Sequence, residues 1–158
     1  MKILVTGANG FVGRHLCACL VKHRHDVVGT VRTATIEPNQ VGWDLRAIGD
    51  ISSDIDWEPL LNGVDLVVHL AARVHIMNDQ ATDPLDAFRQ VNVLGTELLF
   101  RQIGMSNVKR VVYLSTVKVH GDSTSNTPYL AGDELTPSDP YAQSKLEAEN
   151  LVADIGTE

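Results

Sequence analysis

The stretch "KILVTGANGFVG", residues 2–13, decides the fold of this chain. It begins with a short apolar run that ends in glycine, a pattern typical of a strand buried on both faces. Gly7, Gly10 and Gly13 follow, and residues 11–23 then carry apolar side chains at helical spacing. In such a turn the glycines permit a tight bend, close approach of a pyrophosphate and packing of helix on strand, while the helix N-terminus favours an anion. The stretch therefore predicts a dinucleotide-binding turn.

Strand and helix patterns alternate along the rest of the chain. A long helix is expected from Asp83 to Ser106, with Asp83 as its N-cap and Pro84 at its first helical position. The alternation predicts an α/β protein with a Rossmann-type, doubly wound parallel sheet and helices on both faces. Residues 121–139 form a long irregular stretch, of a kind that is often functional. The predicted strands lie at residues 2–7, 25–32, 43–51, 65–72 and 109–116, and further helices at 11–23 and 138–150.

Composition narrows the class of protein. The chain has 158 residues, of which 44% are hydrophobic and 21% charged, and a formal net charge of −7. These values indicate one globular domain and argue against a nucleic-acid partner, because phosphate contacts need a basic face. No apolar run approaches the roughly 20 residues of a membrane span, and the start lacks a secretory pattern, so we expect a cytoplasmic protein with no membrane partner. Cys17 and Cys19 are expected to be buried thiols, and no metal site is predicted.

Five further motifs follow the glycine turn. They are "GDI" at 49–51, "HLAARVH" at 69–75, "NVLGT" at 92–96, "STVKVHG" at 115–121, and Tyr141 four residues before Lys145. With the three-by-three glycine spacing behind "TG", they resemble the extended short-chain dehydrogenase/reductase superfamily, in particular its nucleotide-sugar epimerase/dehydratase family of the UDP-glucose 4-epimerase type. The resemblance covers nearly all of the chain. It departs at His120, where the family carries tyrosine.

The resemblance implies roles for particular residues. Thr116, Tyr141 and Lys145 match the family's catalytic group, and Asn92 matches an asparagine near the cofactor. The residues expected to bind NAD(P) are Gly7, Asn9, Gly10, Phe11, Val12, Gly13, Arg32, Asp50, Ile51, Leu70, Ala71, Ala72, Asn92, Ser115, Tyr141 and Lys145.

The end of the second predicted strand bears on the choice between NAD and NADP. NAD-type relatives carry aspartate where this chain has Val31, and Arg32 follows. A carboxylate binds a free ribose 2′-hydroxyl, whereas a 2′-phosphate needs a cation. The sequence therefore favours NADP over NAD, although Arg32 could also stack on adenine or face solvent.

Tyr141 and Lys145 supply the proton chemistry that this assignment requires. A spacing of four puts any two side chains on one helix face. The pair by itself therefore does not indicate catalysis, and the other motifs are needed for that prediction. A free tyrosine has a pKa of about 10 and is a poor base at neutral pH. The ammonium one turn away is expected to lower that pKa, with help from nicotinamide's charge and a dry cleft. Thr116 is expected to hold the substrate oxygen.

The predicted function is that of an NAD(P)-dependent nucleotide-sugar epimerase or oxidoreductase, with hydride transfer at C4 of a UDP-hexose. Two alternatives stay open, an NADPH-dependent 4-keto-sugar reductase and a dinucleotide-binding module without turnover. A dehydratase is disfavoured, because Val117 and Lys118 stand where the family's dehydratases place acids. Family members are longer, so residues 1–158 are expected to form a partial NAD(P)-binding domain, inactive without the substrate-binding part. The family also implies a homodimer through the long helix and the Tyr141 helix.

Other polar side chains have simpler explanations. His69 lies in an apolar strand and is expected to be a hydrogen-bonded core histidine. Glu147 and Glu149 are expected on a solvated helix face. His75 and His120 lie near the expected cleft and are candidates for contact with substrate.

Overall fold

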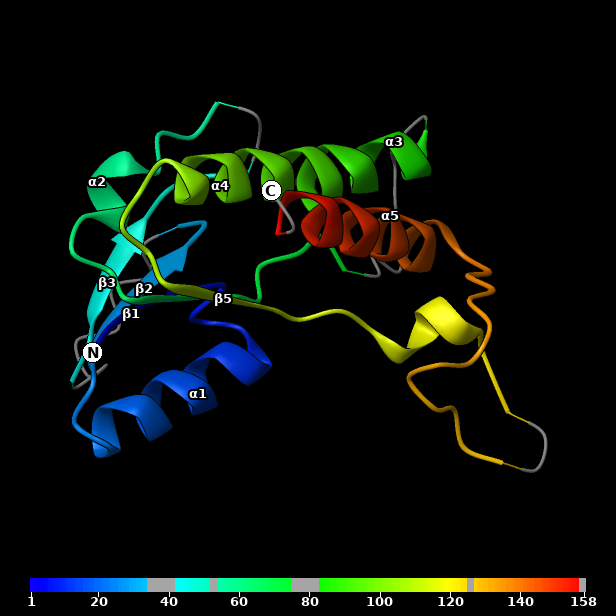
Figure 1. The fold of residues 1–158 in the computed structure, drawn as a ribbon, viewed down its shortest axis with the longest axis horizontal. Helices are drawn as coiled ribbons and strands as arrows, with labels where there is room; N and C mark the ends of the chain where they lie inside the picture. The colour runs from blue at the N-terminus through cyan, green and yellow to red at the C-terminus, as the bar shows by residue number, and fades with distance from the viewer. Residues whose placement is uncertain (34–41, 52–53, 75–82, 125–126, 157–158) are drawn as a thin grey trace. The chain divides into compact units, whose positions relative to one another are not determined.

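A parallel five-stranded sheet organises the first part of the chain (Figure 1). The computed structural model describes residues 1–33, 42–51, 54–74, 83–124 and 127–156. The strand order β3-β2-β1-β4-β5 means that the chain builds outward from β1 in one direction and then, from β4, in the other. The fold class and the five predicted strands are thereby confirmed. The strands are β1 Lys2–Thr6, β2 Asp26–Val31, β3 Asp44–Ala47, β4 Leu66–His69 and β5 Arg110–Tyr113.

The helices follow the predicted order, with additions. The short segments α2 and η2 are absent from the prediction because four residues are too few for a periodic pattern. The long predicted helix runs from Pro84 to Gly104, but its middle part, η1, is π-helical. A π-turn holds one extra residue, and such turns are common at functional sites. The helices are α1 Phe11–Lys22, α2 Glu58–Leu61, α3 Pro84–Arg89, η1 Gln90–Leu94, α4 Gly95–Gly104, the 3-10 segment η2 Val117–His120 and α5 Pro140–Ile155.

Two compact units divide the chain. The first, here called the sheet unit, comprises Met1–Ala72 and Leu98–Leu114 and contains the five strands. The second, here called the helix unit, comprises Arg73–Glu97 and the residues from Ser115 onward. The predicted glycine turn belongs to the sheet unit, and the predicted catalytic residues belong to the helix unit.

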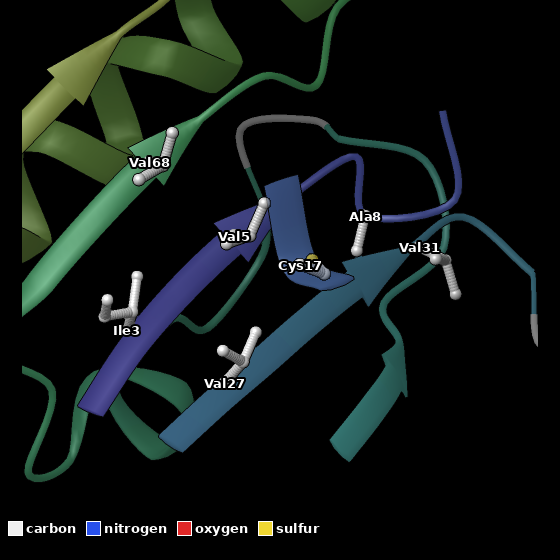
Figure 2. Close-up of a cluster of buried hydrophobic side chains, with 7 residues drawn as sticks. All are labelled: Ile3, Val5, Ala8, Cys17, Val27, Val31 and Val68. Carbon is white, nitrogen blue, oxygen red and sulfur yellow. The ribbon is translucent and has the colours of Figure 1, made fainter. Parts of the chain in front are cut away.

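The core of the sheet unit forms where α1 lies on the strands. Figure 2 shows Cys17 of α1 above side chains of β1, β2 and β4. Alternate residues of a strand face opposite sides of a sheet, so Ile3 and Val5 face α1 whereas Leu4 faces the other side. All three are fully buried, which explains why β1 is a continuous apolar run. The cluster consists of Ile3, Val5, Ala8, Cys17, Val27, Val31 and Val68.

Three rings pack within the sheet unit between the strands and the second half of α4. The ring centroid of His69 lies 6.5 Å from that of Phe100 and 5.8 Å from that of Tyr113. Helix α1 and this part of α4 therefore cover opposite faces of the sheet, as Figure 1 shows. The predicted arrangement with helices on both faces is confirmed.

Helix α5 packs against α3 and η1 in the helix unit, and Figure 1 shows α5 running beside α3. Arg89 and Glu147 join the two helices through a two-pronged ion pair, with Nε to Oε2 at 2.8 Å. The prediction that Glu147 lies on a solvated face is therefore wrong, because packing against α3 brings a guanidinium to it. Helix α3 begins as expected, with Asp83 as its N-cap, and Asp139 caps α5 in the same way; each is followed by proline.

The two cysteines differ in environment. Cys17 is buried, as predicted, and burial raises its pKa to about 11. Cys19 is exposed, so the same prediction is wrong for this residue. Residues two apart on a helix point in nearly opposite directions, and only one of the pair can face the sheet. Within the described ranges, no helix is long and apolar enough to cross a membrane.

Candidate active site

The glycine turn joins β1 to α1 in a conformation that excludes side chains. Gly7 has a φ of +68°, and a Cβ added there would lie 3.0 Å from the backbone of Ala71. A Cβ on Gly13 would overlap the Gly7 carbonyl oxygen and lie 2.9 Å from Ala8 Cα. Gly10 is the N-cap of α1 and has no side chain to bind the first N–H groups. The turn therefore leaves the start of the helix open to an anion.

Thr6 ties the ends of β1 and β4 together beside this turn. Its Oγ1 accepts hydrogen bonds from the N–H groups of Leu70 and Ala71, both at 3.1 Å. Two donors leave its own hydrogen for His69 Nδ1, 2.7 Å away. His69 is 1% exposed, so the prediction of a hydrogen-bonded core histidine is confirmed. Thr6 is not among the predicted site residues, although its place directly before the first glycine of the turn is a signal for it.

The predicted cofactor-binding residues of the sheet unit follow the carboxyl ends of its strands. Parallel strands of a doubly wound sheet bind their ligands at this edge. Phe11 and Val12 are exposed, and Leu70, Ala71 and Ala72 are half-buried. The residues brought to the edge are Gly7, Asn9, Gly10, Phe11, Val12 and Gly13 after β1, Arg32 after β2, Asp50 and Ile51 after β3, and Leu70, Ala71 and Ala72 after β4.

Arg32 and Asp50 form an ion pair at this edge. Arg32 Nε lies 2.6 Å from Asp50 Oδ1, and both side chains are about 70% exposed. The sequence predicts Arg32 as a partner of a ribose 2′-phosphate, and Asp50 only as one of the residues that bind NAD(P). The structure brings them together because β2 and β3 are neighbours and both residues follow the strand ends. A 2′-phosphate would have to compete with Asp50 for the guanidinium.

Asn92 uses its side chain to connect distant segments of the helix unit. Its Nδ2 donates to Arg73 O at 3.0 Å and to Ser144 Oγ at 2.9 Å, and its Oδ1 accepts from Arg73 N at 2.8 Å. Ser144 Oγ in turn donates to Tyr141 O at 2.8 Å. Asn92 is 2% exposed and lies in the π-helical segment. It therefore positions α5, and its predicted place beside the cofactor stays a prediction.

Tyr141 and Lys145 lie one turn apart on α5, in the helix unit. Burial lowers the pKa of Lys145 to about 8, while the charge of Glu149 opposes this shift. The pKa of Tyr141 is raised, mainly by burial, although a hydrogen bond with the Thr116 side chain opposes the rise. The expected lowering of the Tyr141 pKa depends on Lys145 together with nicotinamide's charge and a dry cleft, and it stays a prediction. Desolvation of the phenolate outweighs the hydrogen bond, and the charge of Lys118 also counteracts the rise.

Thr116 directly follows Ser115 at the end of the segment that leaves β5. Thr116 is the N-cap of η2, where its Oγ1 accepts a hydrogen bond from Lys118 N at 3.3 Å. The structure therefore brings Thr116, Tyr141 and Lys145 together in one unit, as the motif spacing predicts. His120 stacks on Tyr129, with ring centroids 5.4 Å apart, while His75 lies outside the described residues.

A pocket of about 1060 Å³ lies elsewhere in the sheet unit. Its walls include Asn62 and Gly63, which precede β4, and Ser106 and Asn107, which precede β5. It therefore lies at the amino ends of the strands, and none of the predicted site residues lines it.

The family model described as "NAD dependent epimerase/dehydratase family" matches residues 3–158. The chain belongs to this family. The resemblance inferred from the motifs is thereby confirmed, and the family's doubly wound sheet agrees with the fold.

Individual members of the epimerase/dehydratase family differ in their reactions. A UDP-glucose 4-epimerase of Vibrio cholerae is 40% identical over 155 residues, which cover 96% of this chain and 46% of the relative. A 2-alkyl-3-oxoalkanoate reductase of Stenotrophomonas maltophilia is 34% identical, with coverage of 96% and 46%. The crystal structure of a Bacillus cereus UDP-glucuronic acid 4-epimerase, in complex with UDP-glucuronic acid and NAD, has a TM-score of 0.84 at 27% identity and covers 100% of this chain and 53% of that one. The chain thus spans about half the length of the relatives it matches.

Proposed function

We propose that this chain is the cofactor-binding part of a nucleotide-sugar epimerase that acts at C4 of a UDP-hexose. The observation that carries the proposal is the placement of Thr116, Tyr141 and Lys145 in one unit, with Lys145 buried one turn from Tyr141 on the same helix and the Thr116 side chain lowering the pKa of the phenol. A proton carrier, a hydroxyl partner and a cation are what an alcohol needs to lose its proton while its carbon loses a hydride. The similarity to UDP-sugar 4-epimerases supports the substrate class.

The sheet unit supplies a cradle that fits a dinucleotide. Gly7 and Gly13 have no room for a Cβ, and Gly10 exposes the N-terminus of α1 to an anion such as a pyrophosphate. The nicotinamide ring, when bound, supplies the hydride acceptor and donor. The chain's own residues have to bind the cofactor, orient the sugar and move the proton.

Tyr141 is proposed to take the proton from the sugar hydroxyl at C4 and to return it after epimerisation. Its raised pKa keeps it protonated at neutral pH, so the charge of Lys145 has to stabilise the phenolate during the reaction. Bringing a tyrosine from a pKa of 10 to near 7 corresponds to about 4 kcal/mol. Because Lys145 is buried, its charge acts through a medium of low dielectric constant, where such a contribution is attainable. Thr116 holds the phenol and the sugar oxygen in line.

A 4-keto-sugar reductase that uses NADPH is the second candidate. Arg32, which has no acidic residue before it at Val31, favours a 2′-phosphate, and one relative is a reductase. The ion pair with Asp50 opposes this preference, and the solved structure of the Bacillus cereus epimerase holds NAD. Measuring how NADH and NADPH compete for binding to the protein decides between the NAD-dependent epimerase and the NADPH-dependent reductase. Arg32→Ala should weaken the binding of NADPH and leave that of NADH nearly unchanged.

The decisive experiment uses the full natural chain with UDP-glucose. Conversion to the 4-epimer and the nicotinamide nucleotide bound to the purified protein are measured for the wild type and for Tyr141→Phe. The substitution should lower turnover by about 10²- to 10⁴-fold and leave cofactor binding intact. Tyr129→Phe is the matched control, because its hydroxyl donates to Ser123 O in the loop before α5. Full turnover in Tyr141→Phe would show that another group carries the proton.

A further inference from the structure

Lys118 lies between two carboxylates of the helix unit. Its Nζ forms an ion pair with Asp139 and lies 3.5 Å from Asp122 Oδ1. Ser138 Oγ donates a hydrogen bond to Asp122 Oδ2 at 2.6 Å. The hydrogen bond to Asp139 raises the pKa of Lys118 above its ordinary value. Lys118 therefore stays charged throughout the neutral range, and the ion pair with it.

Each partner of this ion pair belongs to a segment that carries a proposed catalytic residue. The backbone N–H of Lys118 donates a hydrogen bond to Oγ1 of Thr116, the N-cap of η2. Asp139 is the N-cap of α5, where its Oδ1 accepts a hydrogen bond from Ala142 N at 2.7 Å, and Tyr141 is the second residue of that helix. The pair joins positions 21 residues apart, across the long irregular stretch. An ion pair that joins the two ends of a loop limits how far these ends can separate.

We propose that Lys118 is a positioning residue that, by pairing with Asp139, holds Thr116 against Tyr141 and neutralises the carboxylate that caps the Tyr141 helix. This inference rests on the proposed function of Tyr141, and Lys118 itself does not touch substrate in it. The charges act on the phenol in opposite directions: Asp139 raises the pKa of Tyr141 and Lys118 lowers it, both less strongly than burial.

The other groups around Tyr141 stay constant in the test. Lys145 lies one turn along α5. The ring of Phe88 lies 6.0 Å from that of Tyr141, and the Arg73 guanidinium lies 5.4 Å from the centre of the Phe88 ring. Substitutions at Lys118 or Asp139 leave the Lys145 and Arg73 side chains themselves unchanged.

The inference is tested by titrating Tyr141 in the full natural chain through tyrosinate absorbance, with Tyr141→Phe as the blank. Lys118→Met leaves the Asp139 charge uncompensated and should move the midpoint to higher pH by about half a pH unit. Asp139→Asn keeps the cap, because asparagine caps helices as well as aspartate, and should move the midpoint to lower pH by a similar amount. The double variant should return close to the wild-type midpoint. At neutral pH, Lys118→Met should also lower kcat about threefold through the smaller phenolate fraction, with KM unchanged.

Lys109→Met is the matched control. It breaks an exposed ion pair of the sheet unit, with Lys109 Nζ 3.1 Å from Asp65 Oδ1, and should leave the Tyr141 midpoint where it is. Shifts of the two single variants in the same direction, or no shift in either, would overturn the inference. If Lys118→Met does not fold, Asp139→Asn alone tests the inference. The absence of a shift of the Tyr141 midpoint to lower pH in that variant then contradicts the proposed role of the ion pair. The titration does not depend on turnover. If the proposed function is wrong, the wild type will be inactive on UDP-sugars, and this result is independent of the titration.

Discussion

The glycine turn of the sheet unit and the Tyr141 group of the helix unit are held in place by different forces. At the turn, Gly7 and Gly13 leave backbone atoms so close that no side chain fits. Around Tyr141, the positions depend on hydrogen bonds and charges, from Asn92, Thr116 and a buried lysine. The stability of the glycine turn should therefore depend on side-chain volume and hardly on pH. The stability of the Tyr141 group should depend on both its hydrogen bonds and pH.

The largest effect is expected at Gly13. Gly13→Ala places a Cβ against the Gly7 carbonyl and Ala8 Cα, so the backbone of the turn has to move. We expect a loss of about 3 kcal/mol in the free energy of unfolding in urea, together with loss of cofactor binding. The loss of stability should be the same at acidic and alkaline pH.

Gly104→Ala serves as the matched control for that prediction. A Cβ at Gly104 meets nothing within 4 Å, and alanine is the better helix former, so stability should rise by a few tenths up to about 1 kcal/mol. If Gly13→Ala lost no more stability than Gly104→Ala, the steric explanation of the glycine turn would be contradicted.

Asn92→Ala comes second. The change leaves the backbone N–H and C=O of Arg73 and the hydroxyl of Ser144 without their partner in a buried place, and unfolding in urea should show a loss of about 2 kcal/mol. Asn150→Ala, at an exposed position of α5, should stay within about 0.5 kcal/mol of the wild type. Equal effects of the two substitutions would mean that the Asn92 hydrogen bonds do not order the helix unit.

The smallest effect is a pH dependence from Lys145. Its pKa is about 8 in the folded chain and 10.5 as a free group, so the unfolded state binds more protons between these values. Stability therefore rises with pH from about 8 to 10.5, while below pH 8 the cost of burying the charge is fully present. Relative to Lys145→Met, which cannot titrate there, the wild type should gain roughly 1–2 kcal/mol over this range in denaturation curves.

The difference between wild type and Lys145→Met is the relevant quantity because Cys17 acts in the opposite direction. Its folded pKa of about 11 lies above the ordinary 9.0, so its contribution falls as pH rises between these values. A parallel pH profile of the two proteins would place Lys145 in contact with water and contradict its burial.

Local patterns predicted the elements whose causes are local. β1 is buried on both faces and so is continuously apolar, and Asp83 is recognisable as a cap because it precedes a proline at a helix start. The π-turn of η1 escaped prediction because helical periodicity does not reveal one extra residue, and Asn92 in this turn bonds to segments far away in the sequence. Glu147 was misplaced for the same reason, since its partner Arg89 lies 58 residues earlier.

The sequence by itself determined the order of elements, the glycine turn and the motif set that places the chain in its family, because steric exclusion and apolar periodicity act between near neighbours. Tertiary structure alone decided which side chains became partners. It paired Arg32 with Asp50, joined Lys118 to Asp139 and left Tyr141 with a raised pKa beside a lysine that burial partly discharges. Hydrogen bonds and charges depend on distances and on access to water, and folding sets both.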